Sequence, residues 1–281
     1  MAELVAVVAA SHAPLLARDW DLFDEPLKAR VGAAYRTLGA HLAAARPDAI
    51  VAIGPDHWTN FFLDNLPSAC VGVGAVHGGP PEPFMAGFGR ETLAGDAALG
   101  SHLVATALAT GFEPSISHRL KLDHGFCLPL WRMELDPLPP IVPLVLNCLE
   151  PPMPSIARCA AWGRLLARAI ATFPGPARIA ILASGGLSHS IGEPSMGTID
   201  PAFDAACIAA FETGGDEAVA TFLEEALPAA GNGGHEVRTW AVAHAAAGGN
   251  GFRLVDYLAI PQVYVGCAWA TWTPTTKDDA L

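Results

Sequence analysis

Short apolar runs alternate along the chain with longer stretches that are rich in alanine and leucine. The runs have the length of buried β-strands, and the stretches between them have the length and composition of helices. This alternation is typical of βα units around a largely buried sheet. The pattern predicts strands at 4–10, 48–54, 68–74, 141–147, 178–183 and 262–272, and helices at 26–45, 91–110, 155–172, 201–211, 216–227 and 235–247.

Turn-forming residues separate these segments, and no fixed-period repeat or low-complexity linker interrupts them. Arg46-Pro47 ends the first helix, Gly111 closes the second, and residues 231–234 form a flexible glycine-rich turn. We therefore expect one α/β domain over residues 1–281. Its mixed or mainly parallel central sheet is flanked by helices, with the active site at the carboxyl ends of the strands.

The composition bounds the class of protein and its partners. Hydrophobic residues make up 52% of the chain and charged residues 16%, which is enough apolar material for a large core. The formal charge is −12, and no cluster of lysine and arginine is present, so we expect no binding to nucleic acid. An acidic surface also repels anions, so a substrate carboxylate would need a local Arg or Lys.

The cysteines and the apolar runs indicate a cellular location. Six cysteines are irregularly spaced with no Cys-x-x-Cys, which favours a reducing compartment over a disulfide framework or a thiolate zinc site. No apolar stretch approaches the roughly 20 residues of a membrane span, and the first residues lack the basic region of a signal peptide. We expect a cytoplasmic protein with no membrane association.

Three histidines follow the ends of predicted strands. His12 comes after the first strand, His57 after the second and His189 after the strand at 178–183, each among turn residues. Any one of them alone is more often a hydrogen-bonded loop residue. In an open α/β sheet, however, the loops at the carboxyl ends of strands form the binding crevice, so three such histidines favour a metal or acid/base site.

Other motifs of catalysis are absent from the sequence. His235-Glu236 begins like a zinc-protease helix, but Thr239 stands where the second histidine would be. No Gly-x-Ser-x-Gly elbow and no Walker loop occur, and Gly72-Val-Gly74 lacks the third glycine of a dinucleotide-binding turn.

Five short motifs occur in order and together carry a resemblance. They are Ser-His-Ala-Pro at 11–14, Pro-Asp-His at 55–57, Leu-Asp-His-Gly-Phe at 122–126, Ser-Gly-Gly-Leu-Ser-His at 184–189 and His-Glu-Val-Arg-Thr-Trp at 235–240. The chain resembles the class III extradiol ring-cleavage dioxygenases from about residue 5 to 272. That family includes the catalytic β subunit of protocatechuate 4,5-dioxygenase and 2,3-dihydroxyphenylpropionate 1,2-dioxygenase.

The resemblance implies roles for five side chains. It makes His12, His57 and Glu236 the ligands of Fe(II), and it makes His189 and His124 the acid/base pair. Two imidazoles and one carboxylate leave open positions on iron, and a histidine can take and return a proton near neutrality. From the residues alone, three other carboxylates were equally admissible as ligands: Asp56, Glu150 and Glu193.

Further residues near the motifs are candidates for supporting roles. Asp123 could orient a ring nitrogen of a neighbouring histidine, or could simply cap a helix. Basic residues near the motifs could pair with a substrate carboxylate, although a solvated cation is the more common role; they are Arg119, Lys121, Arg238 and Arg253. Aromatic residues could wall a substrate pocket or belong to the core; they are Trp58, Phe61, Phe62 and Trp240.

The resemblance implies an Fe(II)-dependent enzyme that uses O2 to cleave a catechol-type ring next to its paired hydroxyls. The product would be of the 2-hydroxymuconate-semialdehyde type, in the catabolism of aromatic compounds. We expect a homo-oligomer, and a separate small α-type subunit could complete the site. Two alternatives stay open: a zinc-dependent hydrolase that uses the same residues, because imidazole and carboxylate suit both metals, and a non-enzymatic binding relative.

Overall fold

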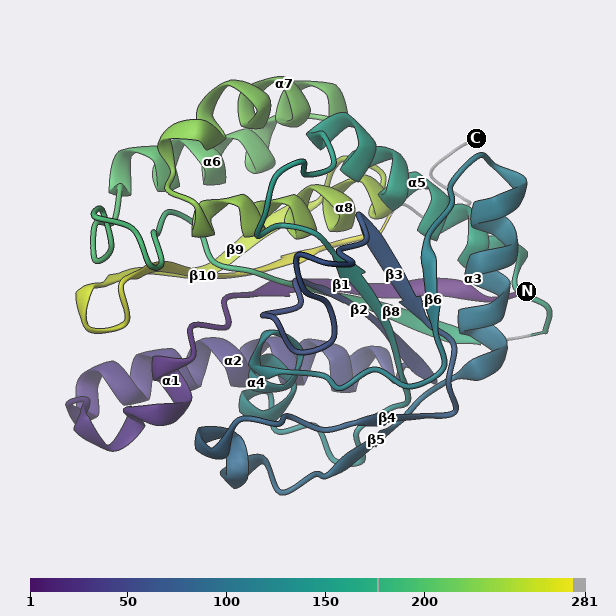
Figure 1. Ribbon diagram of the computed structural model, residues 1–281, viewed down its shortest axis with the longest axis horizontal. Coiled ribbons are helices and arrows are strands. Elements are labelled where there is room, and N and C mark those ends of the chain that lie inside the picture. Colours follow the sequence, from purple (N-terminus) through teal and green to yellow (C-terminus); the bar gives the residue numbers. More distant parts are fainter. Residues whose placement is uncertain (176, 275–281) are drawn as a thin grey trace.

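The central feature of the computed structural model, which describes residues 1–175 and 177–274, is an eight-stranded sheet (Figure 1). Its strand order is β6-β3-β7-β2-β8-β1-β10-β9. The strands are β1 Glu3–Ala10, β2 Ala49–Gly54, β3 Ala69–Gly72, β6 Ser115–Ser117, β7 Ile141–Leu146, β8 Arg178–Ser184, β9 Phe252–Ile260 and β10 Val265–Trp272. A separate antiparallel pair is formed by β4 Val76–Gly78 and β5 Thr92–Ala94.

The middle of the sheet is parallel and its margins are mixed. Strands β7, β2, β8 and β1 run in one direction, whereas β10 and β9 on one side and β3 on the other pair antiparallel. The prediction of an α/β fold with a mixed sheet is therefore confirmed. Because the four parallel strands end at the same edge, the loops after β1, β2 and β8 lie close together.

Helices cover both faces of the sheet (Figure 1). One face carries α3 Ala97–Ala109, α5 Ile156–Thr172, α6 Pro201–Thr213, α7 Asp216–Ala226 and α8 Arg238–Ala246. The other carries α1 Leu15–Arg18, α2 Glu25–Ala45 and α4 His124–Arg132. Five short 3-10 turns are η1 Trp20–Leu22, η2 Pro83–Phe88, η3 Leu227–Ala229, η4 Gly233–Val237 and η5 Pro261–Val263. Within the described residues, no helix combines the length and apolarity that crossing a membrane would require.

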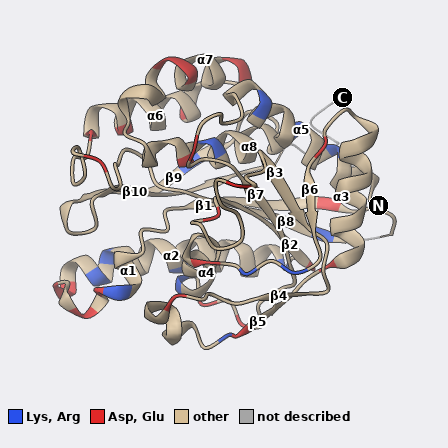
Figure 2. Ribbon diagram, in the orientation of Figure 1, with Lys and Arg blue, Asp and Glu red and all other residues tan. Residues whose placement is uncertain are grey.

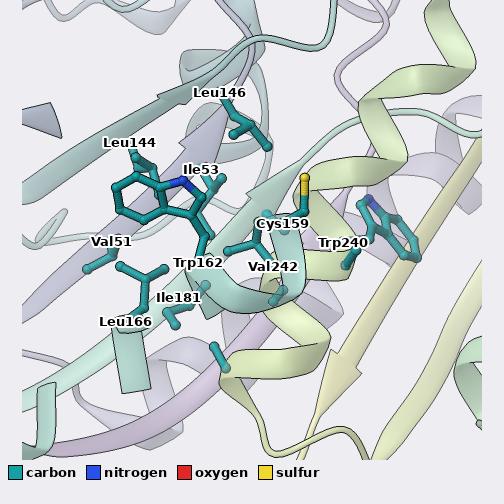
Figure 3. Packing of buried hydrophobic residues seen from close by; sticks show 14 of the residues in the cluster. Val51, Ile53, Leu144, Leu146, Cys159, Trp162, Leu166, Ile181, Trp240 and Val242 are labelled. Atoms are coloured by element: carbon teal, nitrogen blue, oxygen red, sulfur yellow. The ribbon is translucent and has the colours of Figure 1, made fainter. Parts of the chain in front are cut away.

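Two apolar cores follow from the side-chain period of the strands. In β2, Val51 and Ile53 belong to one core, and Ile50 and Ala52 belong to the core on the opposite face. In the first core, Trp162 of α5 packs beside strand residues such as Leu144 (Figure 3). Strands β2, β7 and β10 carry no charged residue, so the charges lie mainly on helices and loops (Figure 2).

The structure corrects three predicted elements. The helix predicted at 91–110 is strand β5 followed by α3, because Asp96 caps α3 by accepting the backbone N–H of Leu99. The helix predicted at 235–247 begins as η4, and α8 starts only at Arg238. The strand predicted at 262–272 starts at Val265, after η5. Strands β4, β6 and β9 and helices α1 and α4 were not predicted.

Candidate metal centre

Three of the motif histidines lie in one cavity at the carboxyl edge of the sheet. The cavity has a volume of about 700 Å³, and His12, His57 and His189 line it from the loops after β1, β2 and β8. His124 at the start of α4 and Glu236 in η4 line the same cavity. The structure thus brings together all five residues to which the resemblance assigned iron or proton chemistry.

The carboxylate of Glu236 is the point on which the imidazoles converge. Its Oε1 lies 3.2 Å from Nε2 of His12, 3.5 Å from Nε2 of His57 and 3.9 Å from Nε2 of His189. Its Oε2 accepts the backbone N–H of Gly186 at 2.8 Å, which directs Oε1 toward the rings. Sequence position alone could not select Glu236. Its carboxylate reaches the histidines because η4 packs against the loop after β8.

The contact with Ser184 fixes the tautomer of the neutral His12 ring. Its Nδ1 lies 2.9 Å from Oγ of Ser184. The Ser184 hydroxyl donates its single hydrogen to the carbonyl of Gly125, so it can only accept from His12. Nδ1 is therefore the protonated nitrogen of the neutral ring, and the lone pair of Nε2 faces Glu236.

The ring of His189 is fixed in the same sense. Its Nδ1 lies 2.8 Å from the carbonyl oxygen of Leu187, which can only accept a hydrogen bond. The neutral ring consequently carries its proton on Nδ1 and presents a bare Nε2 to the cavity. This is the state in which a histidine can accept a proton from a ligand.

A buried carboxylate beside three imidazole nitrogens calls for positive charge next to it, supplied by a ring proton or by a metal ion. Burial by itself raises the pKa of Glu236, but His12, His189 and His57 more than offset this and hold it well below the usual range. Burial lowers the pKa of His57, yet Asp123 and Glu236 raise it to about 10. The lowered pKa of Glu236 and the raised pKa of His57 both mean that the site favours positive charge beside Glu236. The donor set of His12, His57 and Glu236 therefore fits a divalent metal ion.

Asp123 supports His57 from the side away from Glu236. Its Oδ2 accepts the backbone N–H of His57 at 2.6 Å and lies 3.4 Å from the ring Nδ1. Its Oδ1 accepts the backbone N–H of Gly125 and caps α4. The side chain thus caps a helix and also faces an imidazole, which is that of His57 and not of the adjacent His124. Burial raises the pKa of Asp123, but His57 and His124 lower it to about 2.

Glu82, which precedes η2, is a site residue that the sequence analysis missed. Its Oε1 lies 2.8 Å from Nδ1 of His124 and also accepts the backbone N–H of that residue. The His124 ring stacks on His57 with 4.1 Å between centroids. Ligand atoms of His12, His57 and His124 lie within 4.8 Å of one another, so these three histidines form a second group that could hold a metal ion. His12 and His57 belong to this group and also to the group formed with Glu236. No local motif marks Glu82, which the chain brings in from 42 positions away.

The other predicted residues divide between the cavity and its surroundings. Trp58 and Glu150 line the cavity. Asp56 does not line it and instead accepts the backbone N–H groups of Thr59, Asn60 and Phe61, which shapes the loop after His57. Glu193 lines a neighbouring cavity of about 570 Å³.

The predicted basic residues lie elsewhere. Arg238 is buried and donates to the Pro154 carbonyl and to His235, while Arg119, Lys121 and Arg253 do not line the cavity. Among the residues predicted as aromatic walls, Phe61 packs against the core on the α2 side. Phe62 is exposed, and Trp240 is a core residue whose indole donates to Gly185.

A family model and the curated relatives both show similarity to aromatic ring-opening dioxygenases. Residues 6–266 match the family described as "Catalytic LigB subunit of aromatic ring-opening dioxygenase". A 2,3-dihydroxyphenylpropionate/2,3-dihydroxicinnamic acid 1,2-dioxygenase from Pseudomonas putida is 32% identical over 68% of this chain, and the match spans 58% of that relative. A protein with the corresponding name from Mycobacterium sp. (strain MCS) is 28% identical over 95% of this chain and 98% of its own length.

The fold is also found in a solved structure. An uncharacterized protein from Escherichia coli K12, JW3007, superposes with a TM-score of 0.62 over 95% of this chain and 99% of that one, at 17% identity. This likeness concerns the fold alone. In the first two curated relatives the match covers 58% and 62% of their lengths, so it leaves part of each relative unmatched.

Proposed function

Because this chain belongs to the family of catalytic LigB subunits of aromatic ring-opening dioxygenases, we propose that it is an extradiol dioxygenase of a catechol-type substrate. It would cleave the ring next to its paired hydroxyls and place both atoms of O2 in a 2-hydroxymuconate-semialdehyde-type product, in the catabolism of aromatic compounds. The observation that carries this proposal is the convergence of three imidazole Nε2 atoms on Glu236 Oε1 inside one cavity.

We assign His12, His57 and Glu236 as the residues that hold Fe(II). When bound, the ion would supply the redox chemistry between a catechol-type substrate and dioxygen. Ser184 orients the ring of His12, and the backbone N–H of Gly186 orients the carboxylate of Glu236. These partners set the direction of the ligands before the metal arrives.

The two remaining histidines handle protons. His189 presents a bare Nε2 to the cavity and is the base that accepts a proton from a substrate hydroxyl. His124 has its Nδ1 directed to Glu82, so its Nε2 is the atom that can exchange a proton within the cavity. Each ring thus offers one nitrogen to the cavity. The Leu187 carbonyl holds the ring of His189, and the Glu82 carboxylate holds the ring of His124.

We further propose a cytoplasmic homo-oligomer. All six cysteines are free and buried, which suits a reducing compartment. The activity assay described next uses this chain purified without any partner subunit. Turnover by this preparation would show that a separate small subunit is not required.

The direct test is reconstitution with Fe(II) under anaerobic conditions, followed by air and a panel of catechols. We expect oxygen uptake in step with a yellow ring-opened product, and no oxygen uptake after loading with Zn(II). Hydrolytic activity with Zn(II) and no oxygen uptake with Fe(II) would indicate a zinc hydrolase instead. Turnover with neither metal would indicate a binding relative.

A variant of His189 tests the assignment of the base. His189→Gln should keep its iron, because the ligand set is unchanged, and should lose most turnover, by about 100-fold or more. The matched control is His118→Gln, which changes an exposed histidine. Full turnover by His189→Gln would remove this residue from the mechanism.

A further inference from the structure

The cavity around the candidate metal centre extends well beyond the space for one aromatic ring. Its volume of about 700 Å³ is that of a pocket for a drug-sized molecule. The metal-binding and proton-handling residues occupy one part of its wall. The remaining wall is largely apolar and includes Leu15, Leu149, Ile191, Met196 and Val263. A substituted catechol would place its substituent against this apolar part.

Two aromatic side chains at the edge of the cavity are held in an unfavourable backbone conformation. Trp58 has φ 55° and Tyr264 has φ 65°, in the left-handed region that residues other than glycine rarely adopt. Such a conformation is energetically unfavourable, so it persists only where the surroundings hold it. Strain of this kind concentrates at ligand-binding sites. Of the four non-glycine residues with positive φ in the described part of the chain, Trp58 and Tyr264 line this cavity, and Arg46 and Glu134 lie outside it.

Local contacts hold both strained residues in place. The backbone N–H of Trp58 donates to the Asp56 carbonyl at 2.8 Å, and the Asp56 carboxylate accepts the next backbone N–H groups of the loop. Tyr264 directly follows η5 and donates its backbone N–H to the carbonyl of Pro261. Even so, Trp58 and Tyr264 leave 40% and 38% of their surfaces exposed. Exposed aromatic surface beside exposed Ile191 and Met196 is apolar area that a ligand could cover.

The charges of the wall do not suit a carboxylate. Arg18 is the one Lys or Arg among the described residues that line the cavity, and Asp19 already binds its guanidinium through two hydrogen bonds of 2.8 Å. Glu150 adds a negative charge to the wall. A substrate carboxylate would therefore face Glu150 and would have to compete with Asp19 for Arg18.

We propose that the substrate is a catechol with an uncharged, apolar substituent, and that Trp58 and Tyr264 bind this substituent. The inference rests on the proposed ring-cleaving function and adds the class of substrate to it. It separates this chain from the relatives whose names specify 2,3-dihydroxyphenylpropionate, since propionate is a carboxylate.

A matched pair of probes tests the charge preference. 3-Propylcatechol and 2,3-dihydroxyphenylpropionate have side chains of similar length and differ mainly in the carboxylate. We expect kcat/KM of the Fe(II)-loaded enzyme to be at least about tenfold higher for 3-propylcatechol, which corresponds to about 1.4 kcal/mol. Equal or higher kcat/KM for the propionate would overturn the proposal.

A binding measurement separates this inference from the proposed function. Calorimetric titration of the metal-free protein with both probes should give the lower Kd for 3-propylcatechol, whether or not the enzyme turns over. If neither probe is turned over but this order of Kd holds, the proposed reaction fails and the ligand preference stands. If both probes are turned over with the propionate preferred, the reaction stands and the preference fails.

Variants locate the recognition on particular residues. Trp58→Ala should lower kcat/KM for 3-propylcatechol by roughly tenfold and change that for unsubstituted catechol much less, because catechol has no substituent to lose contact. Phe62→Ala removes a neighbouring exposed aromatic outside the cavity and is the matched control. Arg18→Gln should leave the ratio between the two probes unchanged. A selective loss of the propionate in Arg18→Gln, or equal losses for catechol and 3-propylcatechol in Trp58→Ala, would contradict the assignment.

Discussion

At the scale of single residues, hydrogen-bond direction decides which atoms of the site are available. Ser184 has one hydrogen, and its donation to Gly125 obliges it to accept from His12. The carbonyl of Leu187 does the same for His189. The histidines themselves could be predicted from their positions after strands. The side of each ring that faces the cavity could not, because it depends on partners distant in sequence.

Ser184→Ala should weaken metal binding by about 10- to 100-fold, because His12 loses the acceptor that orients its ring. The dissociation constant for Co(II) or Fe(II), measured by competition with a chelator under anaerobic conditions, checks this. Ser117→Ala in edge strand β6 is the matched control and should bind metal like the parent. An unchanged constant in Ser184→Ala would show that Ser184 does not position the ligand.

Glu82→Gln should leave the metal content unchanged and lower kcat by about tenfold or more, because the charged acceptor of His124 is lost. Metal analysis and steady-state kinetics with 3-propylcatechol measure the two effects separately. Glu91→Gln, which changes an exposed carboxylate outside the cavity, is the control. A parallel loss of metal and kcat would instead make Glu82 a determinant of the metal site.

At the scale of elements, continuous apolar runs identified the buried strands and long alanine-rich stretches identified the helices. Strands β1, β2, β7 and β8 are largely buried, so every position favours apolar residues and the signal is strong. Strand β9 lies at the edge and is only partly buried, so its sequence carries Arg253 and Asp256 and was not predicted. Its existence depends on pairing with β10.

The contact between α5 and α8 depends on a glycine. A Cβ on Gly163 would lie 2.2 Å from the carbonyl oxygen of Val242, which is backbone and cannot move aside. Gly163→Ala should therefore lower the free energy of unfolding by about 1–3 kcal/mol, measured by urea denaturation. Gly32→Ala within α2 meets only the flexible end of Arg36 and should be neutral or slightly stabilising. Equal stability of the two variants would contradict this account of the packing.

At the scale of the whole molecule, buried histidines link stability to pH. His244 accepts the indole N–H of Trp272 on Nδ1 and donates from Nε2 to the carbonyl of Gly214. Burial lowers the pKa of His244 below its ordinary value of 6.5, and a proton on Nδ1 would set two donors face to face. The unfolded chain therefore binds this proton more readily than the folded chain.

The contribution of His244 to the free energy of unfolding should consequently fall as pH drops from about 7 toward 5, because stability decreases wherever the unfolded state binds more protons. His244→Gln removes one such group and should make this dependence shallower, by at most about 1.4 kcal/mol per pH unit. Urea denaturation at a series of pH values measures the slope. Exposed His118 is the control position, and an unchanged slope in His244→Gln would refute the assignment.

The amino-acid sequence by itself determined the α/β class, the main strands and helices, and the motifs that indicate the family. These follow from local properties: apolar periodicity, helix caps, and short runs of residues that can be read in order. Only the tertiary structure decided which oxygen of Glu236 faces His12 and His57, that Asp123 contacts His57, and that Glu82 contacts His124. Those pairings join residues from separate loops, and no local pattern encodes them because the sheet must first bring the ends of its parallel strands to one edge.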